Sequence, residues 1–210
     1  MTLLATLTSG LDTLGLALPT PAIEQLEHYL ALLQKWNQVH NLTAIREPEK
    51  MISHHLLDSL AIVPYLQHCQ RVLDVGSGGG LPGVPLAIAC PSMAVTLLDS
   101  NSKKTAFQQQ VMIELGLPNL QVASGRVEQH QPAQAFDAIV SRAFSEMREF
   151  VQLSTHLLAA HGAWYAMKGV YPHEELHALG QNYQTTVYTL QVPQVGAERH
   201  LVKIAPRETA

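Results

Sequence analysis

Cysteine, charge and long apolar runs are all scarce in this sequence. Cys69 and Cys90 are its only cysteines and no C-x-x-C pattern occurs, so neither a disulfide scaffold nor structural zinc is supported. We expect both to be buried thiols. Charged residues make up 14% of the 210 residues, which excludes a disordered polyelectrolyte. The chain is long enough for one good core with an appendage.

Nothing in the sequence predicts a membrane or secretory segment. No apolar run approaches the roughly 20 residues that cross a bilayer. The first lysine or arginine is Lys35, so the leucine-rich start lacks the basic region of a signal peptide. We therefore expect a cytoplasmic protein without a membrane partner, and a monomer. The net charge of -4 argues against coating nucleic acid by bulk charge, so any such partner must meet a local basic patch.

Residues 1–68 predict a small helical region. Thr20 is expected to cap a helix with Pro21 at its first position, an apolar face running to about Trp36, and Asn37 and Asn41 marking its end. Trp36 is expected to anchor the core, with base stacking as the alternative. A further helix is expected from Pro48 until Pro64 stops it.

Residues 69–210 change to short β-rich runs separated by amphipathic segments, which is typical of a parallel sheet with crossover helices. Only Pro193 to Arg199 separate the last two runs, so we expect an antiparallel pair at the end of a seven-stranded, mostly parallel α/β sheet. The expected strands are Arg71–Val75, Ala94–Asp99, Leu120–Ala123, Phe136–Ser141, Gly162–Lys168, Gln184–Val192 and His200–Ala205. The expected helices are Gly83–Ala89, Ser102–Leu115, Met147–Ala159 and Pro172–Gly180.

A glycine-rich turn follows the first strand. A dinucleotide-binding G-x-G-x-x-G pattern fits only two residues late, from Gly78. The pattern D-x-G-x-G-x-G matches this turn without any shift. It resembles the first motif of class I S-adenosylmethionine-dependent methyltransferases, which have a Rossmann-like fold. Asp74 would help to accept the ammonium of that donor, whereas a pyrophosphate needs a bare helix N-terminus. The residues of this motif are Asp74, Gly76, Gly78 and Gly80.

Two later positions favour an adenosine ligand. Asp99 ends the second strand, where a carboxylate can take both ribose hydroxyls of either NAD or adenosylmethionine. Its alternative role is to cap the helix that begins at Ser102. Gly125 to Glu128 follow the third strand, where this superfamily holds adenine, although an ordinary surface turn explains the segment equally well.

Several segments spread over nearly the whole chain carry a more particular resemblance. They are Trp36–Asn37, Asn41–Ile45, His55–Ser59, Asp74–Gly83, Leu97–Ser100, Arg126–Glu128, Ser141–Phe144, Lys168–Gly169 and Gly196 with Glu198–Leu201. In these segments the chain closely resembles the RsmG (GidB) family of 16S ribosomal RNA guanine-N7 methyltransferases. One departure is Gly79, where family loops often have proline.

The resemblance implies a donor, a substrate and contacts. S-adenosylmethionine would be converted to S-adenosylhomocysteine and would contact Gly76, Leu81, the Val127–Glu128 pair and Arg142. The acceptor would be N7 of a guanine in the helix 18 loop of the small-subunit RNA. That atom carries an in-plane lone pair, so no general base is strictly required and alignment supplies much of the catalysis. Arg142 is the one catalytic candidate; its alternative is a salt bridge with Glu146.

Other candidate residues concern the RNA. Lys168, Arg199, His200 and Lys203 are expected to form a positive rim, with a solvated scatter of charges as the alternative. His54 and Asp58 stand four apart on a helix, but two ligands are too few for a metal, so none is expected. With His55 they are expected to bridge domains, to face RNA, or to form a plain polar surface.

Rival functions remain open from the residues alone. They are a methyltransferase acting on a small molecule or a protein, an NAD-dependent oxidoreductase, and a ribosome assembly factor without turnover. A cysteine-nucleophile methyltransferase is disfavoured because Cys90 lies away from the fourth and fifth strand tips. Ser141 to Phe144 likewise lack the pattern of an N6-adenine enzyme. In the leading interpretation the N-terminal helices shape the entrance and help to dock the ribosome.

Overall fold

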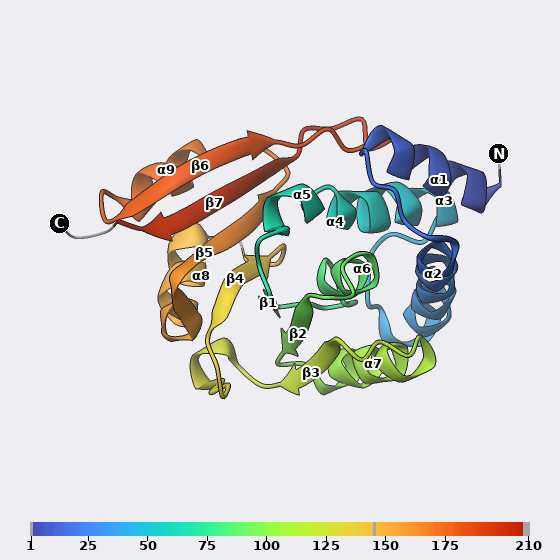
Figure 1. Cartoon of the computed structure of the whole chain (residues 1–210), viewed down its shortest axis with the longest axis horizontal. Coiled ribbons are helices and arrows are strands. Elements are labelled where there is room, and N and C mark those ends of the chain that lie inside the picture. The colour runs from blue at the N-terminus through green and yellow to red at the C-terminus, as the bar shows by residue number, and fades with distance from the viewer. Residues whose placement is uncertain (1, 145, 208–210) are drawn as a thin grey trace.

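A seven-stranded sheet forms the centre of the molecule (Figure 1). The computed structural model describes residues 2–144 and 146–207. Strand order is β3-β2-β1-β4-β5-β7-β6, and every neighbouring pair is parallel except those that involve β7. This confirms the predicted α/β sheet and its antiparallel final strand. The strands are β1 Arg71–Val75, β2 Ala94–Asp99, β3 Leu120–Ser124, β4 Phe136–Ser141, β5 Leu158–Lys168, β6 Tyr183–Thr189 and β7 His200–Pro206.

Helices cover both faces of the sheet. Figure 1 shows α2, α6 and α7 on one side and α8 with α9 on the other. The helices are α1 Leu3–Thr13, α2 Thr20–His40, α3 Pro48–Met51, the π-helix η1 Ile52–Leu57, α4 Asp58–Leu60, α5 Val63–Leu66, α6 Gly83–Ala89, α7 Ser102–Glu114, the 3₁₀ turn η2 Val127–Gln129, α8 Met147–Ser154, the 3₁₀ turn η3 Thr155–Leu157 and α9 His173–Leu179.

Two apolar clusters fill the space between these layers. The larger cluster runs without a break from the N-terminal helices, with Leu26 and Leu57, to Val84 on α6 and Leu97 on β2. The smaller cluster lies on the other face and includes Phe150 and Trp164. Burying this apolar area is the main driving force for the fold. It also fixes the N-terminal helices against the strands that carry the candidate site.

The start and end of α2 follow the prediction in part. Thr20 is its first residue and makes no side-chain capping bond, so the predicted Thr20 cap is wrong; Pro19 holds that position in an extended conformation. Pro21 lies in the first turn, where its missing N–H costs nothing. Asn41 ends the helix with a left-handed φ of 49°, a conformation that asparagine tolerates.

The segment from Pro48 to Leu66 is more broken than predicted. The expected single helix consists of α3, the π-helix η1 and α4, and Pro64 does not stop it. Instead Pro64 lies in the first turn of the separate helix α5, a position that suits proline because no intrahelical N–H bond is needed there. The π-helix contains His54 and His55, and π segments often occur at functional sites.

Two predicted boundaries near the fifth strand are wrong. Helix α8 ends at Ser154 rather than Ala159, and β5 already begins at Leu158. Its pairing with β4 shifts register between Phe136 and Ala138, so the first part of β5 is irregular. The predicted sixth strand was also too long, because β6 ends at Thr189, although Leu190 N still donates to Arg199 O at 2.8 Å.

Other expectations concern single residues and the membrane. Cys69 is buried and Cys90 half-buried, and both thiols are free. Burial raises the pKa of each thiol, that of Cys69 to about 11. Trp36 packs its ring 5.5 Å from that of Phe107, in agreement with a core anchor. In the described part of the chain no helix has the length and apolarity to cross a bilayer.

Candidate functional site

The glycine-rich loop leaves β1 and is held against the end of β2. The amides of Gly76 and Ser77 both donate to the carbonyl of Leu98, at 2.8 and 3.2 Å. Gly76 has a φ of +70°, and an added Cβ would lie 3.0 Å from Cβ of Ala143, just after β4. Ser141 Oγ ties the same two strand ends together by donating to Val75 O at 2.8 Å. The loop therefore lies where strand order reverses between β1 and β4, the usual ligand crevice of such sheets.

Asp74 stabilises this loop from beneath. Its side chain is fully buried, and its Oδ2 accepts a 2.8 Å bond from the amide of Gly83. Burial raises the pKa of Asp74 to about 7, although that bond and the charge of Arg142 act in the opposite direction. An added Cβ at Gly83 would lie 2.2 Å from Leu97 Cδ2, so only glycine permits this approach. Asp74 thus closes the loop and has no exposed surface for the predicted contact with an ammonium.

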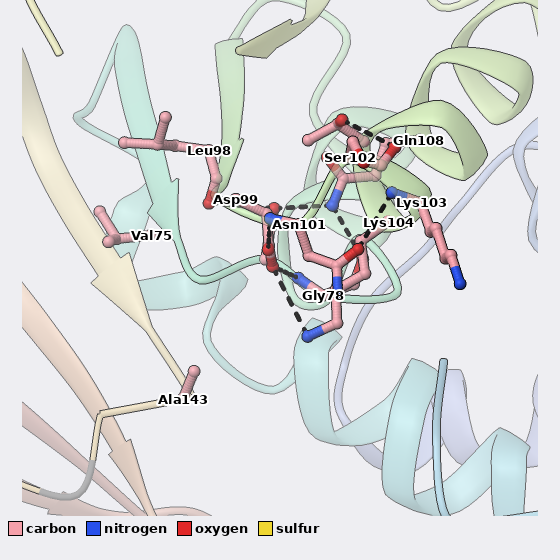
Figure 2. A network of polar contacts seen from close by, with 12 residues as sticks. Val75, Gly78, Leu98, Asp99, Asn101, Ser102, Lys103, Lys104, Gln108 and Ala143 are labelled. Atoms are coloured by element: carbon pink, nitrogen blue, oxygen red, sulfur yellow. Dashed lines mark hydrogen bonds and ion pairs between the residues drawn. The ribbon is translucent and has the colours of Figure 1, made fainter. Parts of the chain in front are cut away.

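Asp99 organises the other side of the loop, as Figure 2 shows. Its Oδ2 accepts from Gly78 N and its Oδ1 from Asn101 N, each at 2.9 Å, and Lys104 Nζ lies 3.8 Å from Oδ2. Asn101, rather than Asp99, caps α7. A carboxylate has about four lone-pair sites, so Asp99 can still accept from two hydroxyls.

Two side chains that sequence reasoning missed fix the loop from behind. Gln108 of α7 donates from Nε2 to both Ser77 Oγ and Gly78 O, at 2.9 and 2.8 Å (Figure 2). Tyr29 of α2 donates its hydroxyl to Gly79 O, and burial raises the pKa of that hydroxyl well above 10. The sequence offered only a weak signal for these two residues, because each is a polar group on the apolar face of its helix. Helix α2 of the N-terminal region and α7 of the sheet domain therefore both help to hold the loop.

A cavity of about 230 Å³ opens beside the loop at the ends of β1, β2 and β3. Four predicted donor-binding residues line it: Gly76, Asp99, Val127 and Glu128. Its remaining lining combines apolar walls with one cation and one further carboxylate, and consists of Val75, Leu98, Ser100, Gly125, Arg126, Phe144, Glu149 and Leu153. We call this the donor cavity.

The other predicted donor contacts lie outside its wall. Gly78 and Leu81 serve the loop itself, Gly78 through its bond to Asp99 and Leu81 through a 2.9 Å bond from its amide to Ser77 O. Gly80 N likewise donates to Ser77 O at 2.7 Å. Arg142 lines a different cavity.

That second cavity has a volume of about 300 Å³ and collects most of the predicted RNA-binding residues. We call it the cationic cavity. Whether these charges converge could not be read from the sequence, and the structure brings them together. Lys203 is not part of the wall. The lining residues are Ile45, His54, His55, Asp58, Arg142, Met167, Lys168, Gly169, Leu190, Arg199 and His200.

Asp58 joins three parts of the chain in this cavity. Its Oδ1 accepts a 3.0 Å bond from Arg199 Nε and its Oδ2 a 3.2 Å bond from Arg142 Nη1. Arg142 also donates to His54 O at 3.0 Å, so its partners are Asp58 and His54 rather than Glu146. Asp58 is buried, so its attraction to both arginines is less screened by water and salt than that of a surface pair. Of the three roles left open for His54, His55 and Asp58, these bonds favour the bridging one.

His55 is held as a neutral ring. Its Nδ1 lies 3.1 Å from His54 O, a group that only accepts, so Nδ1 carries the proton and Nε2 accepts from Thr43 Oγ1 at 2.8 Å. Burial, together with the charge of Arg142, lowers the pKa of His55 to about 4. Among the described residues no three His, Cys, Asp or Glu side chains are grouped as metal ligands.

Lys168 connects the two cavities. Its Nζ donates to Glu175 Oε2 at 2.7 Å and to the carbonyl of Phe144 at 3.2 Å. Phe144 lines the donor cavity, whereas Arg142, two residues earlier, lines the cationic cavity. The short segment after β4 therefore separates a cavity rich in carboxylates from one rich in cations.

Comparison with known proteins decides the family. Residues 22–202 match the GidB family model, described as rRNA small subunit methyltransferase G. The chain belongs to this family. Relatives named ribosomal RNA small subunit methyltransferase G include those of Chromobacterium violaceum, 58% identical over 95% of this chain and 96% of that protein, and Neisseria meningitidis serogroup B, 50% identical over 96% and 97%. The resemblance stated from the sequence is thereby confirmed.

Solved structures support the fold. An O-methyltransferase from Bacillus cereus in complex with SAH matches with a TM-score of 0.61, covering 86% of this chain and 91% of that one at 15% identity. The O-methyltransferase TomG from Streptomyces achromogenes, in complex with SAM, matches with a TM-score of 0.59, covering 85% and 90% at 14% identity. At such identities the likeness concerns the fold, which agrees with the predicted methyltransferase class.

Proposed function

We propose that this member of the family transfers a methyl group from S-adenosylmethionine to N7 of a guanine in the helix 18 loop of 16S ribosomal RNA. The observation that carries the proposal is the pair of adjoining cavities with opposite charge. The donor cavity has three carboxylates in its wall, Asp99, Glu128 and Glu149. The cationic cavity has Arg142, Lys168 and Arg199.

The donor cavity suits adenosylmethionine better than a dinucleotide. The donor has a net positive charge, from its sulfonium and ammonium groups, which neighbouring carboxylates stabilise. The pyrophosphate of NAD has two negative charges and would be repelled by the same wall. Apolar side chains such as Leu98 and Phe144 can cover a flat adenine, while Asp99 lies at the strand end where ribose hydroxyls bind.

The cationic cavity suits a nucleotide of RNA. Phosphate contacts from arginine and lysine supply most of the affinity of such complexes. Arg142 belongs to this cavity, so we propose that it positions the substrate rather than the donor. With Lys168, Arg199, His200 and the neutral ring of His55, it surrounds a space that adjoins the donor cavity.

The chain's residues act by alignment rather than by proton transfer. The bound donor supplies its methyl group, which the lone pair of guanine N7 accepts as the carbon–sulfur bond breaks and S-adenosylhomocysteine is left. The segment from Arg142 to Phe144 would hold the two substrates on either side of a shared boundary. His55 need not act as a base, in agreement with its lowered pKa and its bond to Thr43.

The division of labour along the chain is part of the proposal. Residues 69–210 would hold the donor, while residues 1–68 contribute His54, His55 and Asp58 to the cationic cavity and help to dock the ribosome. We propose a cytoplasmic monomer whose partner is the small subunit.

Labelled methyl transfer tests the proposal directly. Purified protein, radiolabelled adenosylmethionine and small subunits from cells lacking this family's enzyme should give one labelled base, mapped to a guanine N7 in helix 18. Transfer to a protein or a small molecule would instead identify the rival methyltransferase, and donor binding without any transfer would favour an assembly factor. Increasing salt should weaken subunit binding steeply. For single-stranded RNA, each phosphate contact should lower log affinity by about 0.7 for every tenfold rise in salt concentration.

A further inference from the structure

Two adjacent apolar side chains are exposed at the rim of the cationic cavity. Val170 has 73% of its surface exposed and Tyr171 has 42%. They follow directly after Gly169, which lines the cavity, and β5, which ends at Lys168. Exposed large apolar residues beside a binding cavity often mark an interaction surface.

The ring of Tyr171 is held in place from two sides. It lies edge-on to His200, with ring centroids 5.5 Å apart, and 4.3 Å from the ring of His173. His200 lines the cationic cavity, and His173 begins α9, whose Glu175 pairs with Lys168. The tyrosine is thus a supported ring at the cavity rim whose remaining surface is open to solvent.

We propose that Tyr171, with Val170, is a stacking platform for an unpaired base of the RNA, next to the guanine that enters the cationic cavity. This inference rests on the proposed function and names a contact that extends it. Sequence-specific RNA recognition targets unpaired bases, which stack on aromatic side chains. The adjoining cations, Lys168 and Arg199, match the phosphates that flank such a base, which favours RNA over an apolar peptide as the occupant.

Steady-state methylation of unmodified small subunits tests the platform. Stacking on a neighbouring base stabilises the ground state and the transition state alike, so Tyr171→Ala should raise KM and leave kcat unchanged. The expected rise is roughly fivefold to a hundredfold, from the measured cost of losing one base–aromatic stack. Tyr171→Phe and Tyr171→Trp should retain the wild-type KM, whereas Tyr171→Leu, which keeps apolar bulk without a ring, should not.

The matched control is Ile113→Ala. Ile113 is 69% exposed on α7, far from α9 and β5 in Figure 1, so losing it removes exposed apolar surface without touching the rim. Its KM should equal that of the wild type. If Tyr171→Leu matches the wild type, or if Tyr171→Ala lowers kcat and leaves KM unchanged, the ring only supports His200 and the platform is refuted.

A spectroscopic probe gives a second readout that does not need turnover. An RNA stem-loop with the helix 18 loop sequence is labelled with 2-aminopurine, in separate samples on each side of the target guanine, and saturated with protein at low salt. Wild type should quench the fluorescence at one position and Tyr171→Ala should not. Unchanged quenching with a raised KM on subunits would assign the ring to a protein contact and overturn the proposal. If wild type methylates subunits but quenches at neither position, only the platform fails; if it methylates nothing, the proposed function fails.

Discussion

Neutralising Asp58 should have opposite effects on stability and on RNA binding. Asp58→Asn keeps the shape of the side chain but removes the charge that Arg142 and Arg199 share at 3.2 and 3.0 Å. Breaking a fully buried ion pair costs about 3–5 kcal/mol. The two arginines keep 28% and 22% of their side-chain surface in water, so we expect a loss of about 2 kcal/mol. For a chain of this length the unfolding midpoint should fall by about 4–8 °C.

RNA binding should strengthen in the same variant. Both arginines line the cationic cavity and would lose the carboxylate that competes with phosphate for their N–H groups. Two added phosphate contacts would steepen the dependence of log affinity on log salt by about 1.4, at about 0.7 for each contact to a single strand.

The assays are unfolding by urea and by heat, and filter binding of a single-stranded RNA at several salt concentrations. Glu24→Gln is the matched control, because it makes the same charge change on an exposed residue of α2. An Asp58→Asn variant that binds RNA with an unchanged or shallower salt slope, compared with this control, would show that Asp58 does not compete with phosphate.

Three further predictions concern the loop and the buried acid and imidazole. Gly76→Val should abolish the binding of adenosylmethionine, as measured by calorimetry. The free energy of unfolding should fall by only about 1–2 kcal/mol, because the new Cβ would approach Ala143 and the φ at this position is positive. Gln108→Leu should weaken donor binding roughly tenfold, because the loop loses both bonds from Nε2. Isothermal titration measures the affinity, with Gln109→Leu at an exposed position of α7 as the control, and equal affinities of the two variants would refute the prediction. Between about pH 4 and 6.5 the stability of Asp74→Asn should rise with pH more steeply than that of wild type. The raised pKa of Asp74 makes the wild-type free energy of unfolding fall as pH rises from 3.8 to about 7. The lowered pKa of His55 makes the free energy of unfolding rise from about pH 4 to 6.5 in both proteins. Urea unfolding at several pH values measures the difference, and parallel curves for wild type and Asp74→Asn would show that Asp74 does not titrate in this range.

Buried parallel strands were the most predictable part of the fold. Their apolar runs end sharply in glycine or in a polar residue, and the predicted bounds of β1, β2 and β4 agree with the structure. The error at β5 has a physical cause. Residues 157–160 read Leu-Leu-Ala-Ala, which continues the pattern of α8, and their strand pairing is irregular because the register with β4 shifts at this point. Local sequence therefore favoured the helix, while pairing with β4 decided the strand.

The two cavities differ in how far the sequence could predict them. The donor cavity is made by consecutive strand tips, whose order follows from the crossover rule, so Gly76, Asp99 and Glu128 could be placed from the chain alone. The cationic cavity depends on long-range contacts that no periodicity encodes. Asp58 meets Arg142 and Arg199, which are 84 and 141 residues away. One hint was available, because Lys168 ends the fifth expected strand and His200 begins the last one, and antiparallel pairing of β5 with β7 places them opposite each other.

The net charge of -4 argues against binding RNA by bulk charge and requires a local basic patch, so the distribution of charge decides the question. Carboxylates gather at the donor cavity, and three cations gather at its neighbour, where they are already engaged by Asp58, Glu175 or backbone carbonyls. A phosphate therefore competes with these partners for the cations, which makes each isolated contact weak. Several phosphates fixed at matching positions can displace these partners together without an added entropy cost. We therefore expect the folded RNA of a small subunit to bind far better than the same sequence as a flexible strand, a difference that the filter-binding assay can measure.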